Sequence, residues 1–237
     1  MKAIIFAAGL GTRLRPLTDT RPKALIEING VPLLEIAVRK LIKNGCLDII
    51  INVHHFGEQI IDFLKTNDNF GINIAISDER DLLLDTGGGL KKAAWFLHDE
   101  PFMAINSDIL TDMDFKAFYE IHCRSNALAT LAVRDRASSR YLQFDQENKL
   151  CGWKNIKTGE VRASRDTESP RHLAFSGIQV IHPDIFKLMP DESKFSIIDV
   201  YLEAAKKYDI LAYPHDEDLW LDVGKPEALE KGRSLFI

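Results

Sequence analysis

A short apolar run near the start of the chain, ending directly in a pair of glycines, constrains the fold most. Residues Ala3–Ala8 are all apolar, and Gly9 and Gly11 follow them closely. A run of this length bounded by glycine is typical of a strand buried on both faces of a sheet. We therefore predict a central strand whose carboxyl end opens into a glycine turn.

Segments with strand-like and helix-like periods alternate after this run. Apolar residues at 34, 37, 38, 41 and 42 predict a helix over Leu33–Lys43, which Asn44-Gly45 ends. Further helices are expected at Glu58–Leu64, Gly89–Leu97 and Phe115–Cys123. The strands between them are expected in DIIINVHH, INIAIS, FMAINSD and LATLAVR. Such alternation predicts an α/β fold with a mainly parallel central sheet flanked by helices.

The pattern changes after about residue 135. Short strand-like segments, YLQFD, LCGWKNI and HLAFSGIQVI, are separated by polar turns. The stretch Gly159–Pro170 is charged and poor in apolar residues, which favours a mobile loop. We expect a single domain over residues 1–237, with a β-rich insertion at about 136–175.

Composition excludes several classes of partner and location. The 237 residues carry a net charge of −5 and no long basic run, which argues against nucleic-acid binding. No apolar run reaches the length of a membrane span, so we expect no membrane association. Three widely spaced cysteines suggest free thiols and a reducing cytoplasmic location.

The glycine turn leads into a basic loop instead of a helix. Backbone amides freed by Gly9 and Gly11 could cradle phosphates at the strand end. Arg13 suits bidentate phosphate contacts, and Lys23 supplies a compact positive charge. Leu14 stands where a dinucleotide-binding G-x-G-x-x-G would need its third glycine, which argues against a dehydrogenase. A glycine turn beside a solvated basic loop is the alternative interpretation.

Three ordered motifs resemble those of the sugar-1-phosphate nucleotidyltransferases. The stretch AAGLGTRLRPLTDTRPKAL resembles the signature G-x-G-T-R-L-x-P-L-T-x-x-x-P-K-x-L. INSDILTD resembles the strand-end aspartate motif, and WLDVGKPEAL resembles the C-terminal W-x-D-x-G-x-P motif. The resemblance spans nearly the whole chain, and it implies a Rossmann-like nucleotidyltransferase fold.

The resemblance also implies roles for individual residues. It gives Arg13 and Lys23 catalytic roles and makes Asp108 and Asp222 ligands of Mg²⁺. It places the nucleotide on Ala8, Gly9, Gly11, Thr12, Arg13, Lys23, Thr86, Gly87 and Gly88. Asp108, Lys154 and Gly177 are the candidates for binding the sugar phosphate. From local pattern alone, each aspartate is equally well a helix cap or turn residue, Lys154 a solvated strand lysine, and Gly177 a strand bulge.

The expected reaction needs no activated serine, cysteine or histidine. A phosphate monoester is already an anion at neutral pH, since its second pKa is about 6. The difficulty is to bring two anionic substrates together in line, which Mg²⁺, Arg13 and Lys23 would make possible.

The substrates are expected to be a nucleoside triphosphate and a sugar 1-phosphate, handled by a monomer or homodimer. The acid before T-G-G-G, Asp85, resembles the small N-acetylmuramate-1-phosphate uridylyltransferases, which favours UTP and N-acetylmuramate 1-phosphate. Mannose-1-phosphate guanylylation, glucose-1-phosphate nucleotidylation and choline-phosphate cytidylylation stay open. A non-catalytic domain that binds nucleotide-sugars is a further alternative.

Overall fold

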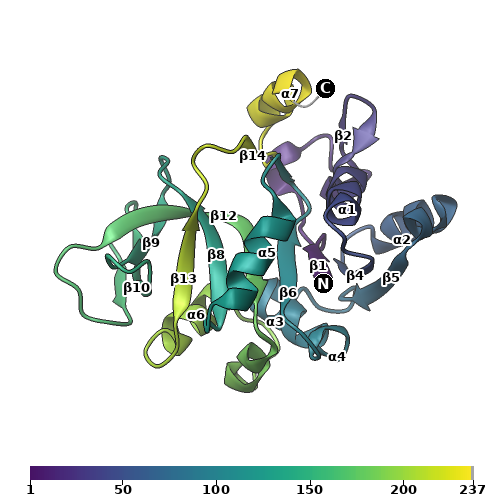
Figure 1. Cartoon of the computed structure of the whole chain (residues 1–237). Coiled ribbons are helices and arrows are strands. Elements are labelled where there is room, and N and C mark those ends of the chain that lie inside the picture. Colours follow the sequence, from purple (N-terminus) through teal and green to yellow (C-terminus); the bar gives the residue numbers. More distant parts are fainter. Residues whose placement is uncertain (236–237) are drawn as a thin grey trace.

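A ten-stranded mixed sheet forms the centre of the molecule, with helices packed on both of its faces (Figure 1). The structure is a computed structural model that describes residues 1–235. The α/β fold expected from the sequence is confirmed.

The elements follow one another along the chain with short connections. The strands are β1 (Lys2–Phe6), β2 (Glu27–Ile28), β3 (Val31–Pro32), β4 (Asp48–Val53), β5 (Asn73–Asp78), β6 (Phe102–Asn106), β7 (Ile109–Thr111), β8 (Ala129–Arg134), β9 (Arg140–Phe144), β10 (Leu150–Asn155), β11 (Val161–Ala163), β12 (Arg171–Ile181), β13 (Ile210–Pro214) and β14 (Trp220–Asp222). The α-helices are α1 (Leu33–Lys43), α2 (Gly57–Thr66), α3 (Asp85–Lys92), α4 (Ala94–Leu97), α5 (Phe115–Arg124), α6 (Ile197–Ala204) and α7 (Pro226–Leu235). The 3₁₀ turns are η1 (Thr12–Leu14), η2 (Lys23–Leu25), η3 (Asp68–Gly71) and η4 (Pro183–Leu188).

The first strand lies inside the sheet, as its apolar run predicts. Strands β5, β4, β1 and β6 are neighbours in that order, and all of their pairings are parallel. Ile4 packs into the core on the face that α3, α4 and α6 cover, whereas Ala3 and Ile5 pack under α1, α2 and α5. Because the carboxyl ends of parallel strands meet at one edge, the loops after β1, β4, β5 and β6 converge there.

The long strand β12 links this parallel core to the segment expected as an insertion. Its last residues pair antiparallel with β6 and β8, and its first residues pair with β9. The register shifts between Phe175 and Gln179, where Gly177 adopts a φ of 75°. Strands β9, β10 and β11 extend the sheet beyond this bulge (Figure 1).

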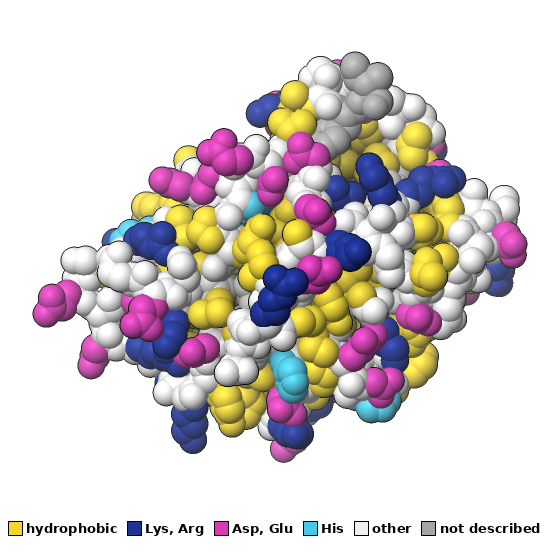
Figure 2. Space-filling view, in the orientation of Figure 1, with side chains coloured by type: hydrophobic (Ala, Val, Ile, Leu, Met, Phe, Trp, Pro, Cys, Tyr) yellow, Lys and Arg dark blue, Asp and Glu magenta, His cyan; other side chains and the backbone are white. Residues whose placement is uncertain are grey.

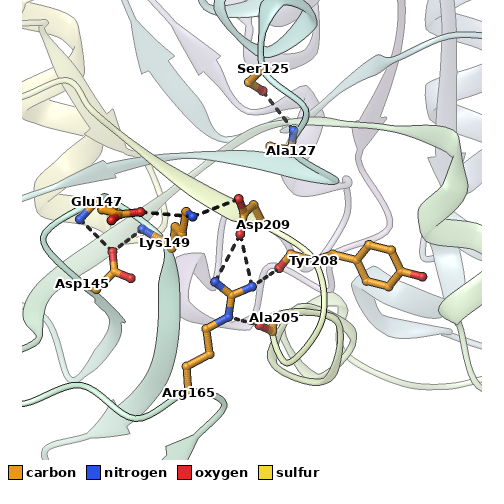
Figure 3. Close-up of polar contacts among 9 residues, drawn as sticks. All are labelled: Ser125, Ala127, Asp145, Glu147, Lys149, Arg165, Ala205, Tyr208 and Asp209. Atoms are coloured by element: carbon orange, nitrogen blue, oxygen red, sulfur yellow. Dashed lines mark hydrogen bonds and ion pairs between the residues drawn. The ribbon is translucent and has the colours of Figure 1, made fainter.

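The segment expected to be a mobile loop is partly a strand and is anchored to the core. Residues Val161–Ala163 form β11, against β10. Arg165 then donates to the Tyr208 carbonyl at 2.7 Å and contacts the Asp209 carboxylate at 3.2 Å (Figure 3). Lys149 contacts the same carboxylate at 3.3 Å. Arg165 thus fastens this segment to the turn between α6 and β13, where Lys149, from just before β10, binds the same carboxylate.

Charge is mixed over the molecular surface on one side. On the face drawn in Figure 2, Lys and Arg side chains are interspersed with Asp and Glu. Among residues 1–235, no helix is long and apolar enough to cross a membrane.

Candidate active site

The glycine turn after β1 forms one wall of a cavity of about 560 Å³. Gly11 has a φ of 63°, which suits glycine. A Cβ on Gly11 would lie 2.9 Å from Thr18 Cγ2 and 3.1 Å from Lys23 Cβ. The missing side chain therefore lets the loop fold back on itself and brings Lys23 to the cavity. Six of the residues expected to bind nucleotide line this wall: Ala8, Gly9, Gly11, Thr12, Arg13 and Lys23.

The strand next to β1 delivers Asp108 to the same cavity. Phe6 of β1 pairs with Asn106 of β6, and Ser107 donates its amide to the Phe6 carbonyl at 3.1 Å. Asp108 therefore emerges directly beside the glycine turn. Its carboxylate forms an ion pair with the Lys23 ammonium, and both side chains are largely buried.

A small two-stranded sheet brings Asp222 to Asp108, although more than a hundred residues separate them. Strands β7 and β14 pair antiparallel, with Asp222 opposite Ile109. The amide of Val223 donates to the Asp108 carbonyl at 2.9 Å. A Cβ on Gly224 would lie 2.7 Å from both Arg13 Nη2 and Asp222 Oδ1. Gly224, for which no role was expected, thus makes room for a carboxylate and a guanidinium side by side.

The two carboxylates influence each other electrostatically. Burial raises the pKa of Asp222, and the neighbouring Asp108 carboxylate raises it further. Lys23, Arg13 and Arg136 act in the opposite direction on this pKa. Asp222 Oδ1 is buried and has no hydrogen-bond partner among residues 1–235. The pair therefore has an unsatisfied oxygen in a region where positive charge is favourable.

The expected nucleotide-binding residues Thr86, Gly87 and Gly88 separate into two groups. Thr86 lines the cavity, and its Oγ1 accepts from the amide of Ile197 at 3.1 Å. Gly87 and Gly88 lie buried inside α3 and donate their amides to the Phe195 carbonyl at 3.0 and 3.3 Å. The glycine run therefore packs a helix closely against the segment before α6.

A second cavity, of about 510 Å³, lies between the inner face of β9–β11 and the start of α6, and Asp222 lines it. Trp153 lines it as well. Lys154 is the next residue along β10, so its side chain projects from the opposite face of the strand. Gly177 lies beside the first cavity instead, since a Cβ there would lie 2.7 Å from Nδ2 of Asn106, which lines that cavity. Lys154 is not among the residues that line either of the two cavities.

An arginine that the sequence interpretation missed lies close to Asp222 instead. The guanidinium of Arg136 stacks on the Trp220 ring at 4.4 Å and donates to the Phe175 carbonyl at 3.1 Å. Burial lowers the pKa of Arg136, whereas the Asp222 carboxylate raises it. The charged stretch VRDR, in which Arg136 lies, does not indicate a binding role, because only the pairing of distant strands brings this arginine close to Asp222.

Comparison with known proteins gives the family. The family model described as nucleotidyl transferase matches residues 2–235. The chain belongs to the nucleotidyl transferase family. This nucleotidyl transferase is 32% identical to an N-acetylmuramate alpha-1-phosphate uridylyltransferase of Neisseria meningitidis, over 99% of the chain and 98% of that protein. It is 31% identical to a mannose-1-phosphate guanyltransferase of Yarrowia lipolytica, over the whole chain and 64% of that protein.

Solved structures agree on the fold. An apo UDP-glucose pyrophosphorylase superposes with a TM-score of 0.79 at 20% identity, covering 100% of this chain and 98% of that one. HddC from Yersinia pseudotuberculosis, complexed with GMP-PN, gives a TM-score of 0.77 at 22% identity, covering 100% and 99%. The family model and the two curated relatives confirm the resemblance of the three motifs to sugar-1-phosphate nucleotidyltransferases, and the chain is an enzyme of nucleotidyl transfer.

Proposed function

We propose that this nucleotidyl transferase joins a nucleoside triphosphate to a sugar 1-phosphate and releases pyrophosphate. One observation carries the proposal: Arg13, Lys23 and Asp108 line the first cavity, and Asp222, which lines the second, lies close enough to all three for their charges to shift its pKa. Such a mixture of carboxylates and cations suits a reaction between two phosphates. The reaction requires no nucleophile from the protein, because an oxygen of the sugar phosphate makes the attack.

The chemistry follows from the charges at the site. An oxygen of the sugar phosphate, already anionic at neutral pH, attacks the α-phosphorus of the triphosphate. A new P–O bond forms to the sugar phosphate as the bond between the α-phosphorus and the bridging oxygen breaks, and pyrophosphate takes the electron pair. Arg13 and Lys23 are assigned to the triphosphate because they flank the glycine turn. Their charges stabilise the negative charge that builds up on the leaving pyrophosphate.

The two aspartates suit a bound Mg²⁺. Among residues 1–235 no group of three or more His, Cys, Asp or Glu side chains is arranged to hold a metal. Mg²⁺ is commonly held by one or two carboxylates, with substrate phosphates and water completing the set. The unsatisfied buried oxygen of Asp222 fits this role. When bound, the ion would offset the repulsion between the two substrates, and Lys23 would keep the Asp108 carboxylate in place.

Arg136 is assigned to the phosphate of the sugar substrate. It lies close enough to Asp222 for each group to perturb the pKa of the other. A guanidinium held over an indole ring is preorganised for a phosphate, so little side-chain entropy is lost on binding. The second cavity, beside Asp222, is then the place for the sugar, with Trp153 as an apolar surface for its ring.

UTP and N-acetylmuramate 1-phosphate are the proposed substrates. The relative from N. meningitidis named for this reaction matches this chain almost from end to end. N-acetylmuramate carries a carboxylate, and two arginines line the second cavity: Arg140, and Arg162, which is paired there with Asp199 at 2.6 Å. Mannose 1-phosphate with GTP is the second candidate, supported by the guanyltransferase of Y. lipolytica at a similar identity.

A substrate panel tests this proposal. The protein is incubated with Mg²⁺, each nucleoside triphosphate and each of several sugar 1-phosphates, and pyrophosphate release is measured. The highest kcat/KM is expected for UTP with N-acetylmuramate 1-phosphate. Release with GTP and mannose 1-phosphate alone would replace the substrate assignment, and no release with any pair would refute the reaction.

A further inference from the structure

A buried asparagine connects the first strand to the loop after β5. Asn52, in β4, is 3% exposed. Its side-chain Oδ1 accepts from the amides of Ala7 and Ala8 at 2.7 and 3.3 Å. Its Nδ2 donates to Glu79 Oε1 at 2.8 Å. One side chain therefore holds the start of the glycine turn and a carboxylate from another loop.

That carboxylate continues the connection to α3. Glu79 is 1% exposed, and its Oε2 accepts from the amide of Leu84 at 3.2 Å. Leu84 directly precedes Asp85 and Thr86, both of which line the first cavity. Hydrogen bonds thus run without a break from the amides of Ala7 and Ala8 to the residues that begin α3.

The surrounding chain is shaped to accommodate this pair. A Cβ on Gly89 would lie 2.7 Å from Glu79 Oε1 and 3.0 Å from Asn52 Nδ2. Both oxygens of Glu79 are thereby occupied by protein donors, although Asn52 and Glu79 both line the cavity. A buried carboxylate is costly to retain for packing alone. The cost of burying Glu79 is explained if this carboxylate holds two loops at the separation that a ligand needs.

We infer that Asn52 and Glu79 are a positioning pair for the nucleoside triphosphate. They fix the separation between the glycine turn, assigned to the phosphates, and Leu84–Thr86 on the opposite wall of the cavity. One nucleotide can then contact both walls without either loop having to be ordered first, which lowers the entropy cost of binding. This inference rests on the proposed function, because it takes the first cavity as the triphosphate site.

Exchange of the donor and the acceptor between the two positions tests the pair. Asn52→Asp leaves two carboxylates facing each other with no donor between them. Glu79→Gln leaves one amide nitrogen facing either the Asn52 amide nitrogen or the Leu84 amide. In the double variant, the Gln nitrogen can donate to the Asp, and the Gln oxygen can accept from Leu84. The double variant therefore restores every hydrogen bond and the original net charge.

The measurement is nucleotide affinity by calorimetry without a second substrate, followed by KM for each substrate. Each single variant is expected to weaken UTP binding about tenfold, as the loss of one buried hydrogen bond to a charged group predicts. KM for the sugar phosphate is expected to stay within about twofold, since its cavity does not include the pair. The double variant is expected to recover UTP affinity to within about threefold.

The control is Asn73→Ala. Asn73 Nδ2 donates to Asp48 Oδ1 at 2.8 Å, which joins the first residues of β5 and β4 at the end of these strands away from Asn52. This variant also removes an amide–carboxylate hydrogen bond between the β4 and β5 parts of the chain, but far from the glycine turn. Its UTP affinity is therefore expected to equal that of the wild type.

Three outcomes would overturn the inference. These are unchanged UTP affinity in the single variants, an equal weakening of both substrates, and a double variant no better than the singles. If Asn52→Asp does not fold, Glu79→Gln and the double variant carry the same comparison. Binding of UTP without any turnover by the wild type would refute the proposed reaction and leave the positioning pair testable.

Discussion

Replacement of Gly88 by alanine is predicted to destabilise the protein without acting directly on the nucleotide. Gly88 is buried in α3. A Cβ there would lie 3.0 Å from Leu84 Cβ and 3.1 Å from the carbonyl carbon of Ser193, and closer still to that carbonyl oxygen. The obstacle is backbone, which cannot rotate away as a flexible side chain would. Either α3 or the segment before α6 must move.

The magnitude follows from two opposing effects. Alanine is favoured over glycine inside a helix by up to about 1 kcal/mol. Forcing a methyl group into a packed interior costs about 1–3 kcal/mol, and contact with fixed backbone belongs at the upper end. We therefore expect a net loss of about 2 kcal/mol in the free energy of unfolding. For a chain of this size, that corresponds to a fall in Tm of about 4–8 °C.

Urea unfolding followed by tryptophan fluorescence measures this loss. Gly9→Ala is the matched control, because a Cβ on Gly9 would meet nothing within 4 Å, yet Gly9 lines the first cavity. It is expected to leave stability within about 0.5 kcal/mol of the wild type and to weaken nucleotide binding. A Gly88→Ala protein of unchanged stability that binds UTP poorly would refute the reasoning, since the glycine run would then be a ligand cradle.

Three further predictions concern other parts of the molecule. Arg136→Gln is expected to raise KM for the sugar phosphate about tenfold or more, whereas Lys154→Ala is expected to leave this KM unchanged. Equal effects of the two variants in steady-state kinetics would contradict the role of Arg136. Asp85 has a φ of 62°, so Asp85→Gly should raise the free energy of unfolding by about 0.5–1 kcal/mol, and a lower value in urea unfolding would contradict this strain. Burial lowers the pKa of both His122 and His215 to about 4. In the unfolded chain each histidine becomes protonated near pH 6.5, whereas in the folded protein it stays neutral down to about pH 4. The unfolded state therefore binds more protons in this range, so the free energy of unfolding should fall from pH 7 to pH 4 by up to about 3 kcal/mol per histidine. A flat pH profile of unfolding would argue against two buried neutral histidines.

The local sequence pattern was sufficient to predict a structure or a role that depends only on the segment in which the residue lies. Helix α1 occupies Leu33–Lys43, as its apolar spacing predicts. Asp108 ends a buried run, which is a local signal for a side chain at the carboxyl edge of a sheet. Its proximity to Asp222 depends on the pairing of β7 with β14, which no local pattern specifies. The family motifs supplied that information.

The remaining differences come from tertiary contacts. The helix was expected to begin at Gly89, but it begins at Asp85, and close packing against Ser193 and Phe195 requires Gly87 and Gly88 inside it. The strand holding Lys154 was expected, but the face on which the lysine lies depends on its register with β9. No role was predicted for Asn52, although a polar residue near the end of an apolar strand indicates a side chain at the carboxyl edge of the sheet.

The most direct test of the account is the stoichiometry of the reaction in the wild type and in Asp108→Asn. Mass spectrometry and a pyrophosphate assay would follow UTP, N-acetylmuramate 1-phosphate and Mg²⁺ over time. The wild type is expected to form nucleotide-sugar and pyrophosphate in equal amounts. The variant is expected to stay folded and to lose at least about a hundredfold in rate, as loss of a charged group at the reacting phosphates predicts. Full activity in the variant would contradict the central role of this carboxylate.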